Sequence, residues 1–189
     1  MDEQHRVVRT RVPISDDLFV FGTGHLVAPG RVLTARHVLA AEGRTAEVGQ
    51  LCQVRVWPCG PDQAWVDGAI AWLHPSEDVG IVGVEGLGAD LTALDWGAVE
   101  GPEPIQWSAL GYPVASLEED DRVEEGVFGR LAPGVGRVEG TARSDGRVAR
   151  AVEGALGNGG WEGLSGAAVF SGSRLVGIIT ADPVVGVVA

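Results

Sequence analysis

The sequence has no lysine and little positive charge: 14 basic residues, all arginine, stand against 26 Asp and Glu residues, for a formal net charge of −12. A chain this acidic repels the phosphates of nucleic acids and of anionic membranes. No stretch approaches the roughly 20 apolar residues of a membrane-spanning helix, and residues 1–12 contain no apolar core of signal-peptide length. We therefore expect no nucleic-acid partner, no membrane contact and a cytoplasmic location.

Cysteine is also scarce, with Cys52 and Cys59 only. Their odd separation places the two thiols on opposite faces of a straight strand, and a reducing compartment keeps thiols free, so we expect no disulfide. Two cysteines without a neighbouring pair of histidines do not make a zinc site. The sequence therefore predicts neither a bound metal nor a cofactor.

What the sequence has in abundance is short apolar runs rich in β-branched residues, separated by turns that contain glycine and proline. This pattern is typical of an all-β sandwich or barrel. Helical periodicity is confined to residues 33–43, where we expect one or two turns. A chain of 189 residues is long enough for two small barrels that share an interface.

A candidate linker divides the chain in two. Residues 97–106 combine glycine, two prolines and two acids between strand-like runs, which is typical of a boundary between units. We accordingly expect an N-terminal barrel at 1–104 and a C-terminal barrel at 105–189, together forming one domain. Within the second unit, the six acids of residues 118–125 predict a solvated loop.

Three segments far apart in the sequence supply the residue types that nucleophilic acyl transfer needs: a serine, a histidine and a carboxylate. In residues 22–39, a strand-like run leads directly into His37, which can act as a general base. Asp78 directly precedes an apolar run, so its carboxylate is expected at the start of a strand. Glycines close on both sides of Ser165 allow a tight turn that exposes the hydroxyl and directs backbone N–H groups into one space.

These segments resemble the three signature blocks of the trypsin-like serine peptidases, which have the chymotrypsin fold. TARHV is similar to the histidine block, EDVGIVGV to the aspartate block and GLSGAAVF to the serine block, and they follow the family's order. The resemblance covers nearly the whole chain. It implies a serine endopeptidase with two six-stranded antiparallel β-barrels and a catalytic triad of His37, Asp78 and Ser165. It also implies an oxyanion hole formed by the backbone N–H groups of Gly163 and Ser165.

The same resemblance implies where a protein or peptide substrate binds. Thr180, Ala181 and Asp182 correspond to the edge strand that pairs with the substrate backbone. Gly159 corresponds to the base of the primary specificity pocket. Because Gly159 carries no acid, the resemblance does not extend to trypsin's preference for basic residues, and Asp182 at the rim is the acid that would attract a basic side chain.

The chain departs from the family pattern at several positions. Arg36 stands where a small residue is usual, Leu164 where an acid or asparagine is usual, and Ala167 and Ala168 where Gly-Pro is usual. The activation sequence of secreted zymogens is absent, which favours the cytoplasmic, regulatory bacterial branch of the family. Residues 182–189 stop within a strand pattern, so we expect the family's C-terminal strand and helix to be missing. A fused or associated regulatory domain, in a longer signalling or defence protein, is the expected context.

Two alternatives remain open. Asp90 and Asp95 are further carboxylates near Asp78, although neither precedes an apolar strand run. A module with a distorted triad would bind a peptide or a partner domain without efficient cleavage. His5, His25 and His74 have no partner motif and are expected to be structural or exposed.

Overall fold

The computed structural model describes residues 6–15, 18–40, 44–56, 63–99, 104–112, 117–118, 121–122, 125–131, 140–143 and 163–180. Most of these residues lie in antiparallel strands, joined by turns and a 3-10 helix. The all-β class predicted from the sequence is therefore confirmed. Over the same ranges, no helix has both the length and the apolar character needed to cross a bilayer.

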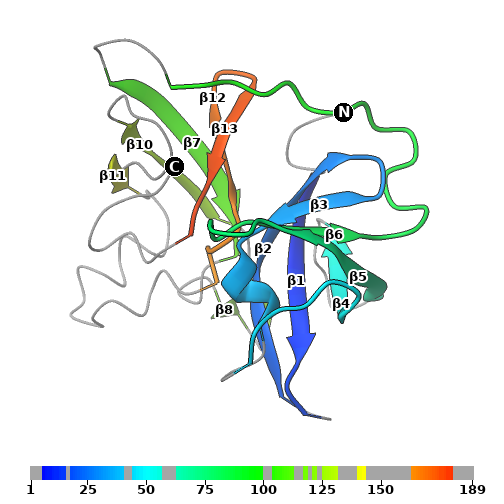
Figure 1. Cartoon of the computed structure of the whole chain (residues 1–189). Coiled ribbons are helices and arrows are strands. Elements are labelled where there is room, and N and C mark those ends of the chain that lie inside the picture. Colours follow the sequence, from blue (N-terminus) through cyan, green and yellow to red (C-terminus); the bar gives the residue numbers. More distant parts are fainter. Residues whose placement is uncertain are drawn as a thin grey trace, which may run out of the picture.

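The N-terminal half of the chain folds into a closed six-stranded barrel with the strand order β1-β2-β3-β6-β5-β4 (Figure 1). The strands are β1 (Val7–Pro13), β2 (Phe19–Ala28), β3 (Arg31–Thr34), β4 (Leu51–Val56), β5 (Val66–Leu73) and β6 (Gly80–Gly83). Buried side chains from every strand fill the interior, among them Val8, Leu26, Val32, Val54, Ile70 and Val82. Burial of this apolar surface is the main force that closes the barrel.

The pairing of β3 with β6 decides where the candidate site forms. The two strands are antiparallel, with Thr34 opposite Gly80. The end of β3 and the start of β6 therefore lie at the same rim of the barrel. His37 follows β3 by three residues and Asp78 precedes β6 by two, so both residues are delivered to this rim.

The chain leaves β3 through the 3-10 helix η2 (Arg36–Leu39), in which Val38 and Leu39 are buried. The helical turn expected within residues 33–43 is thus confirmed. It is short because Ala40 returns to an extended conformation, with φ −94° and ψ 128°. Gly22 makes room for the turn, since a Cβ at this position would collide with the Val38 side chain.

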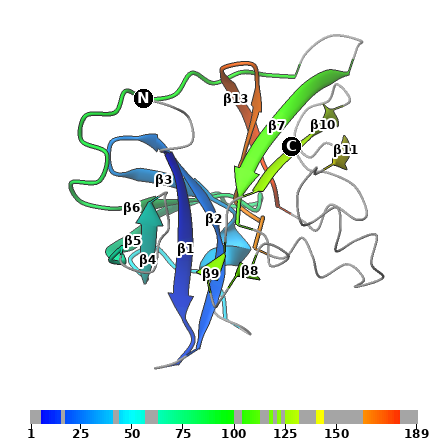
Figure 2. The same ribbon diagram turned by 180° about the vertical axis from the view of Figure 1, so that it is seen from behind.

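The described residues of the C-terminal half form a five-stranded sheet with the order β11-β10-β7-β12-β13 (Figure 2). Its strands are β7 (Ile105–Gly111), β10 (Glu125–Leu131), β11 (Gly140–Arg143), β12 (Ala168–Ser171) and β13 (Arg174–Ile178). A small hairpin, β8 (Leu117–Glu118) with β9 (Asp121–Arg122), lies between β7 and β10 in the sequence. The rest of the predicted second barrel (113–116, 119–120, 123–124, 132–139, 144–162 and 181–189) lies outside the described residues.

The barrel and the sheet share a second apolar cluster. The barrel contributes Val27, Leu33, Ala35 and Val38, and the sheet contributes Ala168, Phe170, Leu175 and Ile178. The connection between the two halves follows this interface, because the Leu94 N–H donates to Val27 in the barrel and the Gly97 N–H donates to Leu175 in the sheet, each at 2.8 Å. The two halves therefore pack against each other around a common core.

Candidate active site

The imidazole of His37 projects from η2 at the rim of the barrel, with half of its side chain exposed. The next two residues, Val38 and Leu39, are buried and anchor the helical turn in the core. The extended conformation of Ala35, with φ −72° and ψ 140°, carries the chain from β3 into the turn. A solvent-accessible imidazole is thus held on a rigid support.

Both carboxylate oxygens of Asp78 contact His37. Oδ2 lies 2.6 Å from Nδ1 of the imidazole, and Oδ1 accepts the backbone N–H of His37 at 2.8 Å. The backbone N–H of Arg36 adds a hydrogen bond to the carbonyl of Asp78 at 3.2 Å. An acceptor facing Nδ1 favours the tautomer with the proton on that nitrogen, which leaves Nε2 free to accept one. This is the geometry of a histidine oriented for general-base catalysis.

The two alternative carboxylates take no part in this contact. Within the described ranges, Asp78 is the acid that bonds to His37. The backbone carbonyl of Asp95 accepts the Leu175 N–H at 3.0 Å, and Asp90 is exposed. The geometry therefore favours Asp78 over Asp90 and Asp95.

Ser165 lies in a tight turn that requires glycine on both sides. Gly163 and Gly166 have φ values of 87° and 91°, in the left-handed region that glycine adopts without a steric penalty. A Cβ at Gly166 would also collide with the backbone oxygen of Thr23 and with Oγ1 of Thr34. The turn is therefore pressed against β2 and β3, the second of which leads into His37.

Thr23 joins the serine turn to the barrel, a role that the sequence analysis missed. Its backbone N–H donates to the carbonyl of Ser165 at 3.0 Å, and its Oγ1 donates to the carbonyl of Gly163 at 2.7 Å. The same Oγ1 accepts the backbone N–H of Tyr112 at 3.0 Å, and the carbonyl of Thr23 accepts the Thr34 hydroxyl at 2.7 Å. One buried residue thus connects both halves of the candidate site. The only signal in the sequence was its place between two glycines in the histidine block.

His25 and Cys52 are poor candidates for catalysis. Burial and the nearby charge of Arg6 lower the pKa of His25 from its usual 6.5 to about 3, so its imidazole is a weak base at neutral pH. Burial raises the pKa of the Cys52 thiol to about 12, so it is not a nucleophile. The imidazole of His74 accepts backbone N–H groups within the turn that leads to Asp78. Of these three histidines, His37 alone presents an exposed ring that a carboxylate orients.

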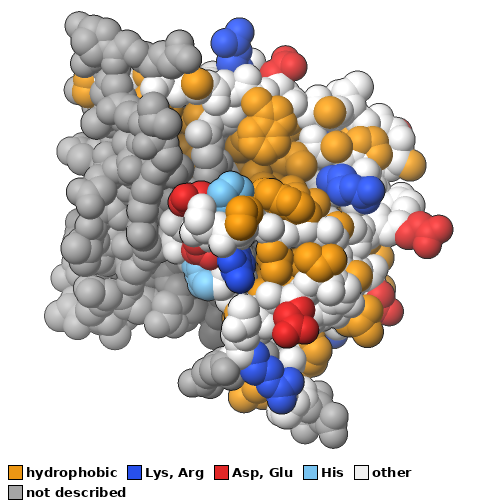
Figure 3. Space-filling model, in the orientation of Figure 1, with side chains coloured by type: hydrophobic (Ala, Val, Ile, Leu, Met, Phe, Trp, Pro, Cys, Tyr) orange, Lys and Arg blue, Asp and Glu red, His pale blue; other side chains and the backbone are white. Residues whose placement is uncertain are grey.

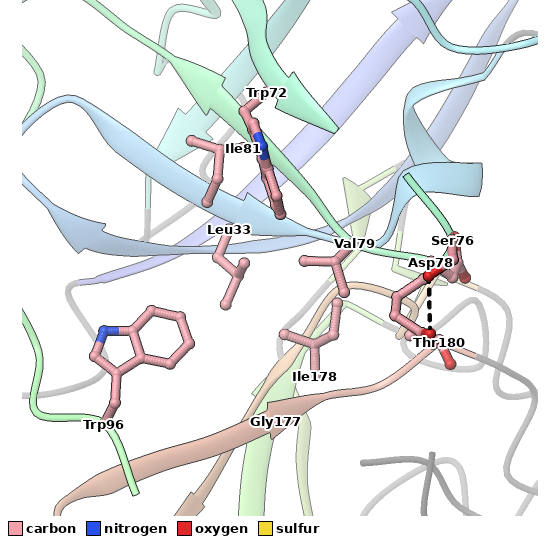
Figure 4. Close-up of a pocket in the computed structure, with 11 residues that line it drawn as sticks. Leu33, Trp72, Ser76, Asp78, Val79, Ile81, Trp96, Gly177, Ile178 and Thr180 are labelled. Carbon is pink, nitrogen blue, oxygen red and sulfur yellow. Dashed lines mark hydrogen bonds between the residues drawn. The ribbon is translucent and has the colours of Figure 1, made fainter. Parts of the chain in front are cut away.

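An apolar cavity of about 420 Å³ lies beside Asp78 (Figure 4). In Figure 4, Trp96 stands at one end, Asp78 and Thr180 stand at the other, and Leu33 and Ile178 lie between them. His37 and Ser165 do not line this cavity. On the face of the molecule drawn in Figure 3, hydrophobic side chains gather next to acidic and histidine side chains.

Several predicted residues lie outside the described part of the chain. They are Gly159, Ala181 and Asp182 of the substrate-binding prediction, together with Cys59 and His5. Thr180 is described and borders the cavity. Within the described ranges, no group of three or more His, Cys, Asp or Glu side chains is arranged to hold a metal ion.

Comparisons with solved structures return trypsin-like serine proteases. The active form of the Rv3671c protease from M. tuberculosis superposes with a TM-score of 0.63 at 19% identity, covering 98% of this chain and 76% of that one. A serine endoprotease from Yersinia pestis gives 0.62 at 14% identity, covering 94% of this chain and 54% of that one. A human pathogenic astrovirus serine protease gives 0.59 at 15% identity, with coverages of 98% and 89%. At these identities the likeness establishes the fold.

The sequence itself establishes the family. No protein with a curated description matches the chain. The family model of the trypsin-like peptidase domain matches residues 22–178, which include all three signature blocks and most of the chain. This chain therefore belongs to the trypsin-like peptidase domain family and is a serine endopeptidase.

Proposed function

We propose that the chain hydrolyses peptide bonds with Ser165 as nucleophile, His37 as general base and Asp78 as the residue that orients the imidazole. The observation that carries this proposal is the double contact of Asp78 with His37, at 2.6 Å to Nδ1 and 2.8 Å to the backbone nitrogen. The hydrogen bonds of Thr23 support it, because they tie the backbone of Ser165 to the strands that lead to His37.

Hydrolysis then proceeds in two steps. Nε2 of His37 accepts the hydroxyl proton of Ser165 while Oγ attacks the carbonyl carbon of the scissile bond. Asp78 remains ionised and stabilises the imidazolium, which next gives its proton to the leaving amine. The amine departs and leaves an acyl-enzyme on Ser165. Water, deprotonated by the same imidazole, attacks the ester and releases the acid product.

The oxyanion that develops during each attack is assigned to the backbone N–H groups of Gly163 and Ser165. Neither group donates a hydrogen bond to another described residue. The peptide group that links Gly163 to Leu164 lies between these two donors. Its carbonyl accepts a hydrogen bond from Oγ1 of Thr23 at 2.7 Å, which fixes its orientation. Donors fixed in advance stabilise developing charge without reorganisation during the reaction.

Substrate recognition is proposed at Thr180, Ala181 and Asp182, which follow β13 in the sequence, with Gly159 at the base of the primary pocket. We expect a preference for small, apolar or modestly basic side chains at the residue whose carbonyl is attacked. A rim acid such as Asp182 attracts a cation through a partly screened contact and discriminates less than a buried acid. A peptide-library cleavage profile that keeps the same basic preference in Asp182→Ala would exclude Asp182 from recognition.

The wider setting is proposed by family resemblance. The domain acts in the cytoplasm as the protease module of a larger bacterial signalling or defence protein, with a fused or associated regulatory domain. Leu164 supports this branch, because it replaces the acid that activation by a new N-terminus requires. Sizing of the native gene product on an immunoblot tests whether a longer protein carries the module.

A fluorophosphonate probe tests the central proposal, because it labels only an activated serine. The wild-type protein should be labelled and should cleave a denatured protein substrate, whereas Ser165→Ala should do neither while it keeps its circular dichroism spectrum. Labelling that persists in Ser165→Ala would place the nucleophile elsewhere. A folded wild-type protein that resists labelling would favour a module that binds peptides without cleaving them.

A further inference from the structure

Asp78 lies in the connection between β5 and β6, at the end of a short turn formed by residues 74–78. We refer to these five residues as the aspartate turn. The His74 N–H donates to the carbonyl of Val79, and the Val79 N–H donates to the carbonyl of Glu77, both at 2.9 Å. Ser76 and Glu77 are exposed. A turn this exposed has few apolar contacts of its own, so hydrogen bonds must hold its shape.

The imidazole of His74 supplies the hydrogen-bond acceptor inside this turn. Its Nδ1 accepts the backbone N–H of Glu77 at 2.9 Å and that of Ser76 at 3.3 Å. A ring nitrogen that accepts hydrogen bonds carries no proton, so the ring proton of neutral His74 resides on Nε2. The side chain acts as Asn or Asp does when it caps backbone N–H groups two and three residues ahead.

The first residue of the aspartate turn is also tied to the helix that carries His37. Nη1 of Arg36 donates to the carbonyl of His74 at 3.2 Å, and the backbone N–H of Arg36 donates to the carbonyl of Asp78 at 3.2 Å. Arg36 therefore holds both ends of the turn. The rings of His74 and Trp72 make an edge-to-face contact, with centroids 5.6 Å apart and planes at 85°.

We infer that His74 is a positioning residue for Asp78: its Nδ1 sets the shape of the aspartate turn, and the turn sets the carboxylate against His37. The inference rests on the proposed function, in which Asp78 orients the general base. The two contacts of Asp78, at 2.6 Å and 2.8 Å, require the carboxylate to be placed accurately. Displacements of about 1 Å in a catalytic group can cost on the order of 100-fold in rate.

Three substitutions separate this role from a general contribution to folding. His74→Phe keeps an aromatic ring against Trp72 but removes the acceptor. His74→Asn loses the ring but restores an acceptor at the same point of the chain. Ser76→Ala is the matched control, because it truncates a side chain in the same turn and keeps the backbone N–H. We expect kcat to fall about 10- to 100-fold in the Phe variant with little change in KM, to recover most of that loss in the Asn variant, and to be unchanged in the control.

A second readout is independent of turnover. The proton between Nδ1 of His37 and Oδ2 of Asp78 should give a strongly downfield resonance in the proton NMR spectrum, because the bond is short and charge-assisted. This resonance should persist in His74→Asn and in Ser76→Ala, and should weaken or shift in His74→Phe. Measured in the Ser165→Ala background, it reports the His37–Asp78 contact alone.

The outcomes distinguish the two proposals. Wild-type protein that neither reacts with the fluorophosphonate nor cleaves peptide overturns the proposed function, whatever His74 does to the resonance. An active enzyme whose kcat and downfield resonance are the same in His74→Phe as in wild type overturns the positioning role and leaves the triad standing. If His74→Phe does not fold, His74→Asn decides: near-wild-type kcat supports the role of the acceptor, and a 10-fold or greater loss in the folded Asn variant overturns it.

Discussion

Nδ1 of His37 and Oδ2 of Asp78 lie 2.6 Å apart although 41 positions of sequence separate them. The antiparallel pairing of β3 with β6 brings them together, because each residue stands just outside one of these strands at the same rim. The second oxygen of Asp78 accepts the backbone N–H of His37, so the carboxylate is bound to both the ring and the main chain of its partner. The strand pairing that helps to close the barrel therefore also brings the carboxylate to the imidazole.

Asp78→Asn tests this contact. The amide can still accept the backbone N–H of His37 through its oxygen, but its NH₂ group then faces Nδ1 and favours the wrong tautomer. We expect kcat for peptide cleavage to fall about 10³- to 10⁴-fold with the fold intact. Steady-state kinetics measure this loss of kcat. Asp95→Asn is the matched control, because the Asp95 side chain does not contact His37. Equal losses in the two variants would contradict the assignment of Asp78.

The serine turn predicts a contrast between two glycines. Gly166 and Gly172 both have positive φ, at 91° and 60°, but a Cβ would collide with Thr23 and Thr34 only at Gly166, and would meet nothing within 4 Å at Gly172. Gly172→Ala should cost about 1–2 kcal/mol in free energy of unfolding, the penalty of the left-handed conformation alone. Gly166→Ala should cost more than about 3 kcal/mol or prevent folding. Urea unfolding of both variants measures the difference, and similar costs would show that the turn is not packed against the barrel.

Much of this site could be predicted from local patterns. The runs RVLT and GIVG carry β-branched residues typical of strands. A candidate base follows the first run by three residues, and a candidate carboxylate precedes the second by two. The short helical turn at His37 and the need for glycine beside Ser165 follow from the same local reading. These features depend on residues close in the sequence, where conformational preference and hydrophobic pattern carry the information.

The roles of Thr23 and His74 could not be predicted in the same way. A threonine in a strand is ordinary, and its partners Gly163 and Tyr112 are 140 and 89 positions away. His74 bonds to near neighbours, but the position of its ring also depends on Trp72, which contacts the ring, and on Arg36, which donates to the His74 carbonyl. Both roles arise from tertiary packing that fixes a side-chain rotamer.

Thr23→Val should weaken both stability and catalysis. The substitution is nearly isosteric but leaves the Gly163 carbonyl and the buried Tyr112 N–H without the hydroxyl that bonds them. We expect a loss of about 2–6 kcal/mol in free energy of unfolding, from one buried and one partly buried group at about 1–3 kcal/mol each, together with a lower kcat. Thr10→Val is the control: the Thr10 hydroxyl is buried and has no hydrogen-bond partner among the residues that the structure describes, so its removal should be neutral or stabilising. A Thr23 variant as stable as the Thr10 variant would refute the bridging role.

Acid sensitivity should trace in part to His25, which is buried against Phe170 with ring centroids 5.1 Å apart. Its Nε2 has no hydrogen-bond partner within the described part of the chain. Burial lowers its folded-state pKa from the usual 6.5 to about 3. Between these values the unfolded chain binds a proton that the folded chain does not. Stability is therefore complete above about pH 6.5 and falls as the pH drops toward 3, by up to about 4 kcal/mol from this group.

His25→Leu removes the titrating group and the unpartnered nitrogen while it keeps an apolar side chain against Phe170. The variant should lose less stability than wild type when the pH is lowered from 7 to 4, and its free energy of unfolding at pH 7 should be equal or higher. Urea unfolding at the two pH values measures both quantities. Because the carboxylates titrate in wild type and variant alike, subtracting the two pH profiles isolates His25. A difference profile that stays flat from pH 7 to 4 would mean that His25 gains its proton as easily in the folded protein as in the unfolded chain.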